Sequence, residues 1–313
     1  LWFFLGPFWA KSPKKPDPTG VRFPLWERPC VAMGCKAAPA IVLITEEAQM
    51  HISLNGKRAI VSGSTAGIGL AIAIGLAEAG AEVVLNGRTQ ARVDEALKVV
   101  RERLPQARII GIAADLSTQA GAQTLFKQVP HTDILVNNLG IFEPKPFFEI
   151  EDEDWQRFFD VNVLSAVRLS RHYAPGMAER KWGRVMFLSS ESALQIPTEM
   201  IHYGMTKTAL LAVSRGLAET LAGTGVTVNS VLPGPTRSEG VGDFFAKLAE
   251  EQGVSTEELE ANFLAEHRPT SLIKRLATVE EVANMVVYLA SMQASATTGA
   301  ALRVDGGVLR SIA

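Results

Sequence analysis

The fold is decided by one stretch of the chain, Ala59-Ile60-Val61-Ser62-Gly63-Ser64-Thr65-Ala66-Gly67-Ile68-Gly69. Its apolar start predicts a short buried strand, and a helical segment over residues 70–79 follows the glycines directly. Glycines allow a tight turn and a close approach of the backbone to a ligand, while the free amides of a helix N-terminus favour a phosphate group. The stretch therefore predicts a strand-to-helix turn that holds the pyrophosphate of a dinucleotide. A tight turn that binds nothing is the alternative interpretation.

Similar apolar runs recur along the rest of the chain, with helix-length spacers between them. They cover residues 82–85, 109–113, 134–136, 185–188, 226–232 and 301–304. Short apolar strands with such spacers predict right-handed βαβ units and a parallel sheet covered on both faces. We expect an α/β fold, a doubly wound parallel sheet of about seven strands (a Rossmann fold), in a single domain over residues 50–313.

Residues 1–49 have a different texture, because they are rich in proline and show no helical or strand periodicity. We predict a poorly ordered N-terminal extension. Met50 is then a candidate for the true start of the protein, and a targeting or docking arm is the alternative explanation of the residues before it. The apolar residues 1–10 are too short to span a bilayer, and basic residues follow them, which is the reverse of a secretory signal.

Charge and cysteine content narrow the classes of function. A formal net charge of −2 over 313 residues leaves no broad basic surface for a nucleic acid. The two cysteines, Cys30 and Cys35, have no second pair and no histidine cluster that would complete a zinc pattern. We therefore expect no nucleic-acid partner, no membrane partner and no metal, and we expect a cytoplasmic protein.

The choice of cofactor depends on the residues after the second strand, Leu85-Asn86-Gly87-Arg88-Thr89. No acid is present to bind a free ribose 2′-hydroxyl, whereas the guanidinium of Arg88 can bind a 2′-phosphate. This favours NADP(H) over NAD(H), although Ala66 supplies no second basic residue and Arg88 could simply cap a solvated loop. Asp115, after the third strand, is placed to meet the adenine. Its alternative role is to cap the following helix, a role for which Ser117 competes.

Three residues form a candidate catalytic group. Tyr203 and Lys207 are four apart in a helical segment that runs to about residue 221, so they share one face. A nearby ammonium lowers the pKa of a phenol, which suits a general acid and base for carbonyl chemistry. Ser190 follows the strand that ends at residue 188, where its hydroxyl can donate to a substrate carbonyl, while its neighbour Ser189 is the simpler turn residue. By spacing alone, Tyr203 and Lys207 would more often be a surface pair.

Taken together, these motifs resemble a classical short-chain dehydrogenase/reductase over essentially all of residues 50–313. The resemblance also rests on further motifs in the family's order: Asn137-Asn138-Leu139-Gly140, Asn162, Pro233-Gly234 and Val304-Asp305-Gly306-Gly307. It implies that Tyr203 donates and accepts the proton, that Lys207 also holds the nicotinamide ribose and that Ser190 orients the carbonyl. It further implies that Asn162 supports a water-linked proton relay, and that the chain forms a homotetramer or homodimer through the helices containing Asn162 and Tyr203.

The same resemblance implies a set of cofactor contacts. Asn137 would stabilise the central sheet and Gly140 would bring the backbone close to the cofactor. This chain departs from the family at Ser62, where threonine is usual, at Leu139, where alanine is usual, and in the blurred Pro-Gly-x-x-x-Thr pattern that ends at Thr236. The cofactor-binding residues expected on this basis are Gly63, Ser64, Thr65, Gly67, Ile68, Gly69, Arg88, Asp115, Leu116, Asn137, Gly140, Tyr203, Lys207, Pro233, Gly234 and Thr236.

A long segment of about 237–271 resembles a helical substrate lid, since it exceeds what a plain connection requires. Helical periodicity predicts apolar clusters on it, and further apolar residues lie between Ser190 and Tyr203. We expect a largely apolar carbonyl substrate of the 3-oxoacyl type; packing of the lid onto its own domain is the alternative. Glu191 and His202 either touch the substrate or point to solvent. The apolar residues concerned are Phe244, Phe245, Leu248, Phe263, Leu264, Ile196, Met200 and Ile201.

The function predicted from the sequence is that of an NAD(P)-dependent oxidoreductase, which transfers hydride between nicotinamide and a ketone or alcohol. One alternative is a sugar-nucleotide epimerase or dehydratase, which the glycine spacing and the lack of a large C-terminal substrate domain disfavour. The other is a non-catalytic scaffold that senses a nucleotide. A scaffold has no need of Ser190, Tyr203 and Lys207 together.

Overall fold

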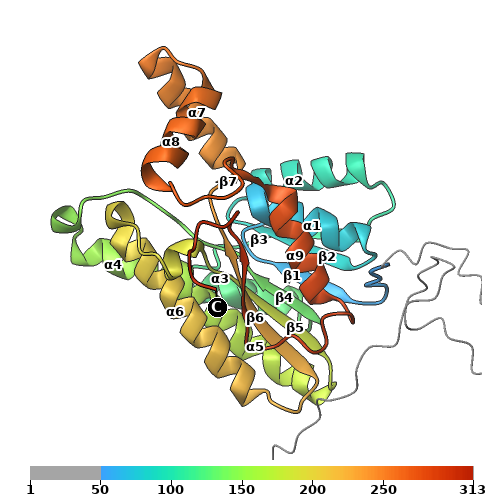
Figure 1. Cartoon of the computed structure of the whole chain (residues 1–313). Coiled ribbons are helices and arrows are strands. Elements are labelled where there is room, and N and C mark those ends of the chain that lie inside the picture. Colours follow the sequence, from blue (N-terminus) through green and yellow to red (C-terminus); the bar gives the residue numbers. More distant parts are fainter. Residues whose placement is uncertain (1–50, 313) are drawn as a thin grey trace, which may run out of the picture. The chain divides into compact units, whose positions relative to one another are not determined.

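The predicted apolar runs form a seven-stranded parallel sheet in the computed structural model, which describes residues 51–312 (Figure 1). Neighbouring strands follow the order β3-β2-β1-β4-β5-β6-β9, and every pair is parallel. The predicted doubly wound α/β fold is thereby confirmed. The strands are β1 (Arg58–Val61), β2 (Glu82–Gly87), β3 (Ile109–Ala113), β4 (Ile134–Asn137), β5 (Gly183–Leu188), β6 (Val226–Pro233) and β9 (Ala301–Val304).

Two hydrophobic clusters show how the sheet is covered on both faces. Along β1, Ala59 and Val61 contribute to one cluster and Ile60 to the other, because successive side chains of a strand point to opposite faces. One cluster joins the sheet to α1 (Gly67–Glu78), α2 (Gln90–Arg103) and α9 (Val279–Ala290). The other joins it to α3 (Gln119–Gln128), α5 (Ser165–Glu179) and α6 (Ile201–Thr220).

The segment predicted to be a lid contains two helices, α7 (Glu239–Gln252) and α8 (Thr256–His267), which lie next to each other at the end of β7 (Figure 1). β7 (Thr236–Arg237) pairs with β8 (Ala277–Thr278) in a separate two-stranded sheet. Phe245 and Leu264 are buried in a cluster of this region, and the side chains of Phe244 and Leu248 lie outside the described residues. The role of this segment as a lid remains a prediction.

The remaining elements connect β4 to β5 and β5 to α6. They are the 3-10 turns η1 (Phe147–Glu149), η3 (Glu191–Ala193) and η4 (Thr198–Met200), the helix α4 (Asp152–Phe159) and a π-helical turn, η2 (Asp160–Leu164). Within residues 51–312, no helix combines the length and the hydrophobicity needed to cross a membrane. Cys30, Cys35, Met50 and the predicted extension 1–49 lie outside the described residues.

Two helix starts differ from the sequence prediction. α1 begins at Gly67 and not at Leu70, so the last glycines of the loop belong to the first turn of the helix. The helix after β3 is capped by neither Asp115 nor Ser117 but by Thr118, whose hydroxyl accepts a hydrogen bond from the amide of Gly121. The physical reason is that Asp115 uses its carboxylate on Ser117 instead, at 3.0 Å from its amide nitrogen and 2.6 Å from its hydroxyl.

Candidate active site

The carboxyl ends of β1, β4, β5 and β6 meet at one edge of the sheet, where a cleft of about 520 Å³ opens. Such an edge is where open α/β sheets bind their ligands. The structure brings predicted residues from both halves of the chain to this cleft. Those that line it are Ile68, Gly140, Ser190, Tyr203, Lys207, Pro233, Gly234 and Thr236.

The glycine loop reaches the cleft through Ile68, whereas Gly63, Gly67 and Gly69 are absent from the lining of the cleft and shape the turn from β1 to α1. Gly63 and Gly67 have φ values of 60° and 55°, a region that side chains disfavour. A Cβ at Gly69 would lie 2.5 Å from the carbonyl oxygen of Gly63, so only glycine fits there. The N-cap residue of α1, Ala66, makes no side-chain hydrogen bond to the helix, which leaves the first amides of α1 to a phosphate. The loop therefore fits the pyrophosphate of a dinucleotide.

Hydrogen bonds hold this loop in place. The buried hydroxyl of Ser64 donates to the carbonyl of Val61 at 2.7 Å and accepts from the amide of Asn86 at 2.9 Å. The hydroxyl of Ser62 accepts from the amides of Asn138 and Leu139, each at 3.0 Å. Serine at position 62 therefore anchors the chain after β4 to the loop with its hydroxyl alone, and the methyl group of the usual threonine is not needed.

The residues predicted to meet the adenosine half lie at the ends of β2 and β3. The side chain of Arg88 is exposed, and it makes no hydrogen bond or ion pair within the described part of the chain, so its guanidinium is available to a ligand. Asp115 is half-buried, and the side chain of Leu116 is buried in the core, which leaves Leu116 only its backbone for a cofactor contact. Thr65 packs on Gly87, where a Cβ would lie 2.4 Å from the Thr65 methyl carbon.

Lys207 and Tyr203 lie on α6, with the ammonium nitrogen of Lys207 5.5 Å from the centre of the Tyr203 ring. Lys207 is buried and donates to the carbonyl oxygen of Leu188 at 2.8 Å. Ser189 donates its hydroxyl hydrogen to the carbonyl of Lys207 at 2.8 Å, so it ties α6 to the end of β5. Both Ser189 and Ser190 line the cleft, and the hydroxyl of Ser189 is used in this contact with α6.

The pKa values of these two groups differ from the sequence prediction. Burial lowers the pKa of Lys207 to about 8. Burial raises the pKa of Tyr203, and the charge of Glu191 raises it further, while a hydrogen bond with Ser190 and the charge of Arg268 lower it in part. The expected lowering of the Tyr203 pKa by Lys207 is not found, because both groups are desolvated in the same cleft.

Asn162 lies in the π-helical turn η2, where it is fully buried. Its side-chain oxygen accepts from the amide of Ile141 at 2.8 Å, and its nitrogen donates to the Ile141 carbonyl at 3.1 Å and to the Thr206 hydroxyl at 3.0 Å. A Cβ at Gly140 would lie 3.3 Å from the Lys207 ammonium nitrogen and 3.4 Å from the side-chain oxygen of Asn162. Asn162, Gly140 and Lys207 thus converge, and the helix irregularity is what brings Asn162 to them.

Three further predicted residues stabilise the structure around the site. Asn137 is buried and donates to the hydroxyl of Ser170 at 3.1 Å, a contact from β4 to α5. Thr236 is buried in β7, and its hydroxyl donates to the carbonyl oxygen of Gly234 at 2.9 Å. A Cβ at Gly234 would lie 2.7 Å from Asp305 Cα, so this glycine is required by close packing against the chain after β9.

Glu191 and Arg268 are charged residues of the cleft whose pairing the sequence did not reveal. The hydroxyl of Ser190 donates to Glu191 Oε2 at 2.6 Å and accepts from the amide of Ser192 at 3.1 Å. The other oxygen of Glu191 accepts from Arg268 Nε at 3.0 Å, and both side chains line the cleft. Glu191 therefore does not point to solvent. The two partners are separated by 77 positions, and no local pattern signals the contact.

His202, the second residue left open by the sequence, is fully buried and is absent from the lining of the cleft. Its ring packs against Phe158 at a centroid distance of 4.0 Å and against Trp155 at 6.0 Å. Burial lowers its pKa, so the neutral imidazole is favoured. Among the side chains that the structure describes, which leave out several in α7, no group of three or more His, Cys, Asp or Glu is placed to hold a metal ion.

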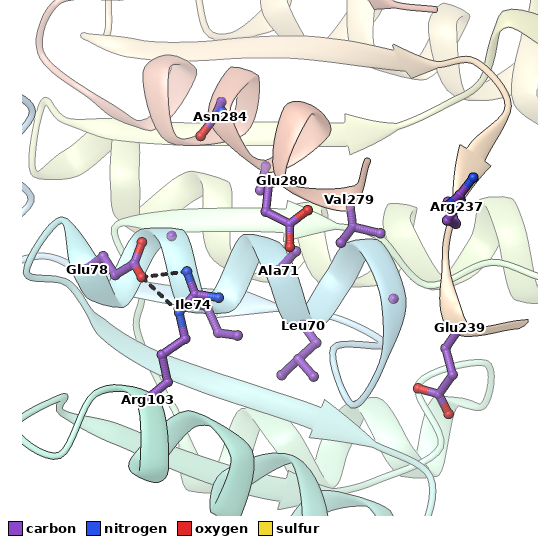
Figure 2. A pocket seen from close by; sticks show the side chains of 13 residues that line it. Leu70, Ala71, Ile74, Glu78, Arg103, Arg237, Glu239, Val279, Glu280 and Asn284 are labelled. Carbon is purple, nitrogen blue, oxygen red and sulfur yellow. Dashed lines mark hydrogen bonds and ion pairs between the residues drawn. The ribbon is translucent and has the colours of Figure 1, made fainter. Parts of the chain in front are cut away.

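A second hollow, of about 240 Å³, lies on the outer side of α1 and α9 (Figure 2). Leu70, Ala71 and Ile74 from α1 form part of its wall, and Glu78 pairs with Arg103 at 3.0 Å beside them. Ser190, Tyr203 and Lys207 do not line it. Of the predicted site residues, Gly67 lines this hollow, whereas the predicted catalytic group lines the cleft at the carboxyl edge.

Comparison with known proteins shows the family to which the chain belongs. A family model described as Enoyl-(Acyl carrier protein) reductase matches residues 63–309. The chain belongs to the short-chain dehydrogenase/reductase family, and it is an NAD(P)-dependent oxidoreductase that acts on hydroxyl and keto groups. The fold and the family predicted from the sequence are confirmed.

Three relatives illustrate the similarity. "Uncharacterized oxidoreductase YvaG" of Bacillus subtilis is 49% identical over 263 residues, which cover 84% of this chain and all of the relative. The 3-oxoacyl-[acyl-carrier-protein] reductase FabG of Aquifex aeolicus is 31% identical and covers 83% of this chain and all of its own length. The structure of L-sorbose reductase from Gluconobacter frateurii with NADPH and L-sorbose is 34% identical, with a TM-score of 0.78, and covers 84% of this chain and all of its own.

Proposed function

We propose that this enzyme prefers NADP(H) and interconverts a ketone and a secondary alcohol, with Tyr203 as the general acid and base. The observation that carries the proposal is that Ser190, Tyr203 and Lys207 line the same cleft as Gly140 and Ile68, which belong to the predicted cofactor-binding residues. When bound, the reduced nicotinamide supplies the hydride for the carbonyl carbon, and the oxidised form accepts it in the reverse reaction. The protein residues supply binding, orientation and the proton.

In the direction of reduction, the phenol of Tyr203 donates its proton to the carbonyl oxygen. Burial raises the pKa of Tyr203, so the protonated form that a general acid requires is present at neutral pH. Ser190 donates a second hydrogen bond to the same oxygen and stabilises the charge that develops there. Because Ser190 donates to Glu191 in this structure, the hydroxyl has to turn from the carboxylate to the substrate.

Lys207 and Asn162 serve the proton supply and the cofactor. Lys207, next to Gly140, would hold the nicotinamide ribose. Asn162 fixes the backbone of Ile141, which lines the cleft, through two hydrogen bonds. In this way Asn162 would support a water-linked proton relay to Lys207. Asn162 is thus a positioning residue in this proposal.

The preference for NADP(H) rests on Arg88. Its exposed guanidinium follows β2, and no acid lies in Asn86-Gly87-Arg88-Thr89 to bind a free 2′-hydroxyl. A guanidinium binds a phosphate through two charge-assisted hydrogen bonds. The L-sorbose reductase that this chain resembles is bound to NADPH, which supports the same choice.

The outer part of the cleft supports a substrate with hydrocarbon character. Its apolar side chains come from the loop after β4, from the turn before α6 and from the helices α7 and α8. We propose that these helices act as the lid. We also propose that the chain forms a homotetramer or homodimer through α6, which carries Tyr203, and the helical stretch of η2 and α5 that includes Asn162. The apolar lining includes Ile141, Phe142, Met200, Val241, Phe245, Phe263 and Leu276.

The test is reduction of a ketone panel by the purified protein, followed by loss of NADPH or NADH absorbance. We expect faster oxidation of NADPH. Equal or better use of NADH would contradict the role given to Arg88. A scaffold that senses a nucleotide would bind NADPH, which its fluorescence would show, but it would not oxidise NADPH in the presence of any ketone.

A further inference from the structure

We propose that Glu191 and Arg268 form a subsite for a hydroxyl group next to the reacting carbonyl, so that the enzyme acts on α-hydroxyketones and on the corresponding vicinal diols. The inference rests on the proposed function and specifies its substrate class. The hydroxyl is bound and not transformed, so reduction of the neighbouring carbonyl gives a diol.

The pair lies directly beside the reacting position. Glu191 Oε2 is 2.6 Å from the hydroxyl oxygen of Ser190, and Glu191 Oε1 is 3.0 Å from Arg268 Nε. Both residues line the cleft together with Tyr203, although their side chains are only 6% and 9% exposed. A substrate whose carbonyl meets Ser190 and Tyr203 therefore has Glu191 next to the atoms that follow the carbonyl carbon.

Hydrogen-bonding capacity remains at the pair. Arg268 Nη1 donates to the carbonyl of His267 at 2.8 Å and contacts Glu199 at 3.5 Å. Within the described part of the chain, no hydrogen bond is formed by Arg268 Nη2, which carries two N–H donors. Each carboxylate oxygen of Glu191 accepts one of these side-chain bonds and has room for another. The subsite thus offers an acceptor and a donor side by side.

A hydroxyl matches this pair better than the other common substituents. It donates to Glu191 and accepts from Arg268 at the same time. A substrate carboxylate can only accept, and it would be repelled by the charge of Glu191. An alkyl group would leave both charged groups without the hydrogen bonds of water that it displaces. The pair therefore selects a neutral, hydroxylated carbon.

The pair also has a cost that an apolar wall would avoid. The charge of Glu191 raises the pKa of Tyr203, and a buried ion pair contributes little to the stability of a fold. Arg268 follows the last turn of α8, so the donor of the subsite comes from the segment proposed as the lid. Binding of a hydroxyl would thereby join the lid to the catalytic serine.

The test compares hydroxyacetone with two control ketones. 2-Butanone matches its size but has no hydroxyl, and methoxyacetone keeps the electron-withdrawing oxygen but cannot donate a hydrogen bond. NADPH oxidation gives kcat and KM for each. We expect kcat/KM for hydroxyacetone to exceed the other two at least about tenfold, as for one hydrogen bond to a charged group. Equal values for hydroxyacetone and 2-butanone overturn the subsite alone. No oxidation of NADPH with any of the three overturns the proposed function and the subsite with it.

Variants locate the effect. Glu191→Gln and Arg268→Lys should each lower the ratio of hydroxyacetone to 2-butanone in kcat/KM at least about threefold, mainly through KM for hydroxyacetone. Glu199→Gln is the matched control, because it removes a carboxylate that contacts Arg268 but does not line the cleft, and the ratio should stay within about twofold of wild type. If both subsite variants slow the three ketones equally, the pair serves only to position Ser190 and the subsite is overturned. Thermal unfolding and NADPH titration check the folding of each variant. If Glu191→Gln does not fold, the ratio of kcat/KM values measured for Arg268→Lys tests the subsite.

Discussion

The two walls of the cleft are built in different ways. The wall from β1 to α1, where Ile68 lines the cleft, is shaped by backbone: glycines with positive φ, a helix start without a side-chain cap, and the hydroxyls of Ser62 and Ser64, which hold the loop. The wall from β5 and α6 presents side chains, and several of them are charged and buried. The first wall is thus sensitive to added volume, whereas the second is sensitive to changes of chemical group at constant volume.

The largest effect is expected on the side-chain wall. Tyr203→Phe removes only the phenolic oxygen, and kcat should fall by about a thousandfold because no other group of the proposed mechanism donates the proton to the carbonyl. NADPH affinity, measured by fluorescence titration, should change less than about threefold. Retention of more than a tenth of the wild-type turnover would show that another group supplies the proton.

On the backbone wall, a single added methyl group should be enough. In Gly69→Ala, the new Cβ would lie 2.5 Å from the Gly63 carbonyl oxygen and force the loop apart, so NADPH affinity should fall by about a hundredfold with a lower Tm. Gly216→Ala is the matched control: a Cβ there meets nothing within 4 Å, and alanine in a helix interior should raise stability by up to about 1 kcal/mol. Unchanged NADPH binding in Gly69→Ala would contradict the steric account of the loop.

Beside the wall from β1 to α1, cofactor binding is expected to depend on one side chain, that of Arg88 after β2. Arg88→Ala should weaken NADPH binding by about tenfold or more, the loss of hydrogen bonds to one charged group, and should leave NADH binding within about twofold. Titration of both nucleotides with the wild type and the variant gives the comparison. Equal weakening of NADH would mean that Arg88 does not read the 2′-phosphate.

The smallest effect concerns the buried charge of Lys207 in the unliganded protein. Burial lowers its pKa from 10.5 to about 8, so between about pH 8 and 10 the unfolded chain binds more protons than the native one and stability rises with pH. From pH 7.5 to 9.5 the gain should be about 1–2 kcal/mol in urea unfolding. Lys207→Met should abolish this gain, while Lys98→Met, at an exposed position, should keep it. The same gain in Lys207→Met would assign it to another group.

The sequence predicted the strands best, because a short apolar run marks the same residues that are placed in the sheet. The strands at residues 109–113 and 301–304 were predicted with their observed bounds, because short apolar runs between helix-length spacers are typical of the strands of a parallel sheet. It was less informative at helix starts: Gly67 begins α1 three residues early, and Thr118 replaces Asp115 and Ser117 as the cap. Capping depends on which side chain is free to turn toward the helix, and Asp115 was already bound to Ser117.

By itself, the sequence predicted the order of strands and helices and the glycine loop from apolar runs and residue type. It predicted the group of Ser190, Tyr203 and Lys207 from their place after the fifth strand and from the other motifs of the family, since spacing alone was not enough. Only the tertiary structure decided what surrounds that group. It brought Arg268 from the end of α8 to Glu191 beside Ser190, turned His202 away from the cleft, and raised the pKa of Tyr203 where an ammonium four residues away had suggested the opposite. The physical reason is that burial and contacts between distant segments set the electrostatics of a site, and neither is encoded in local spacing.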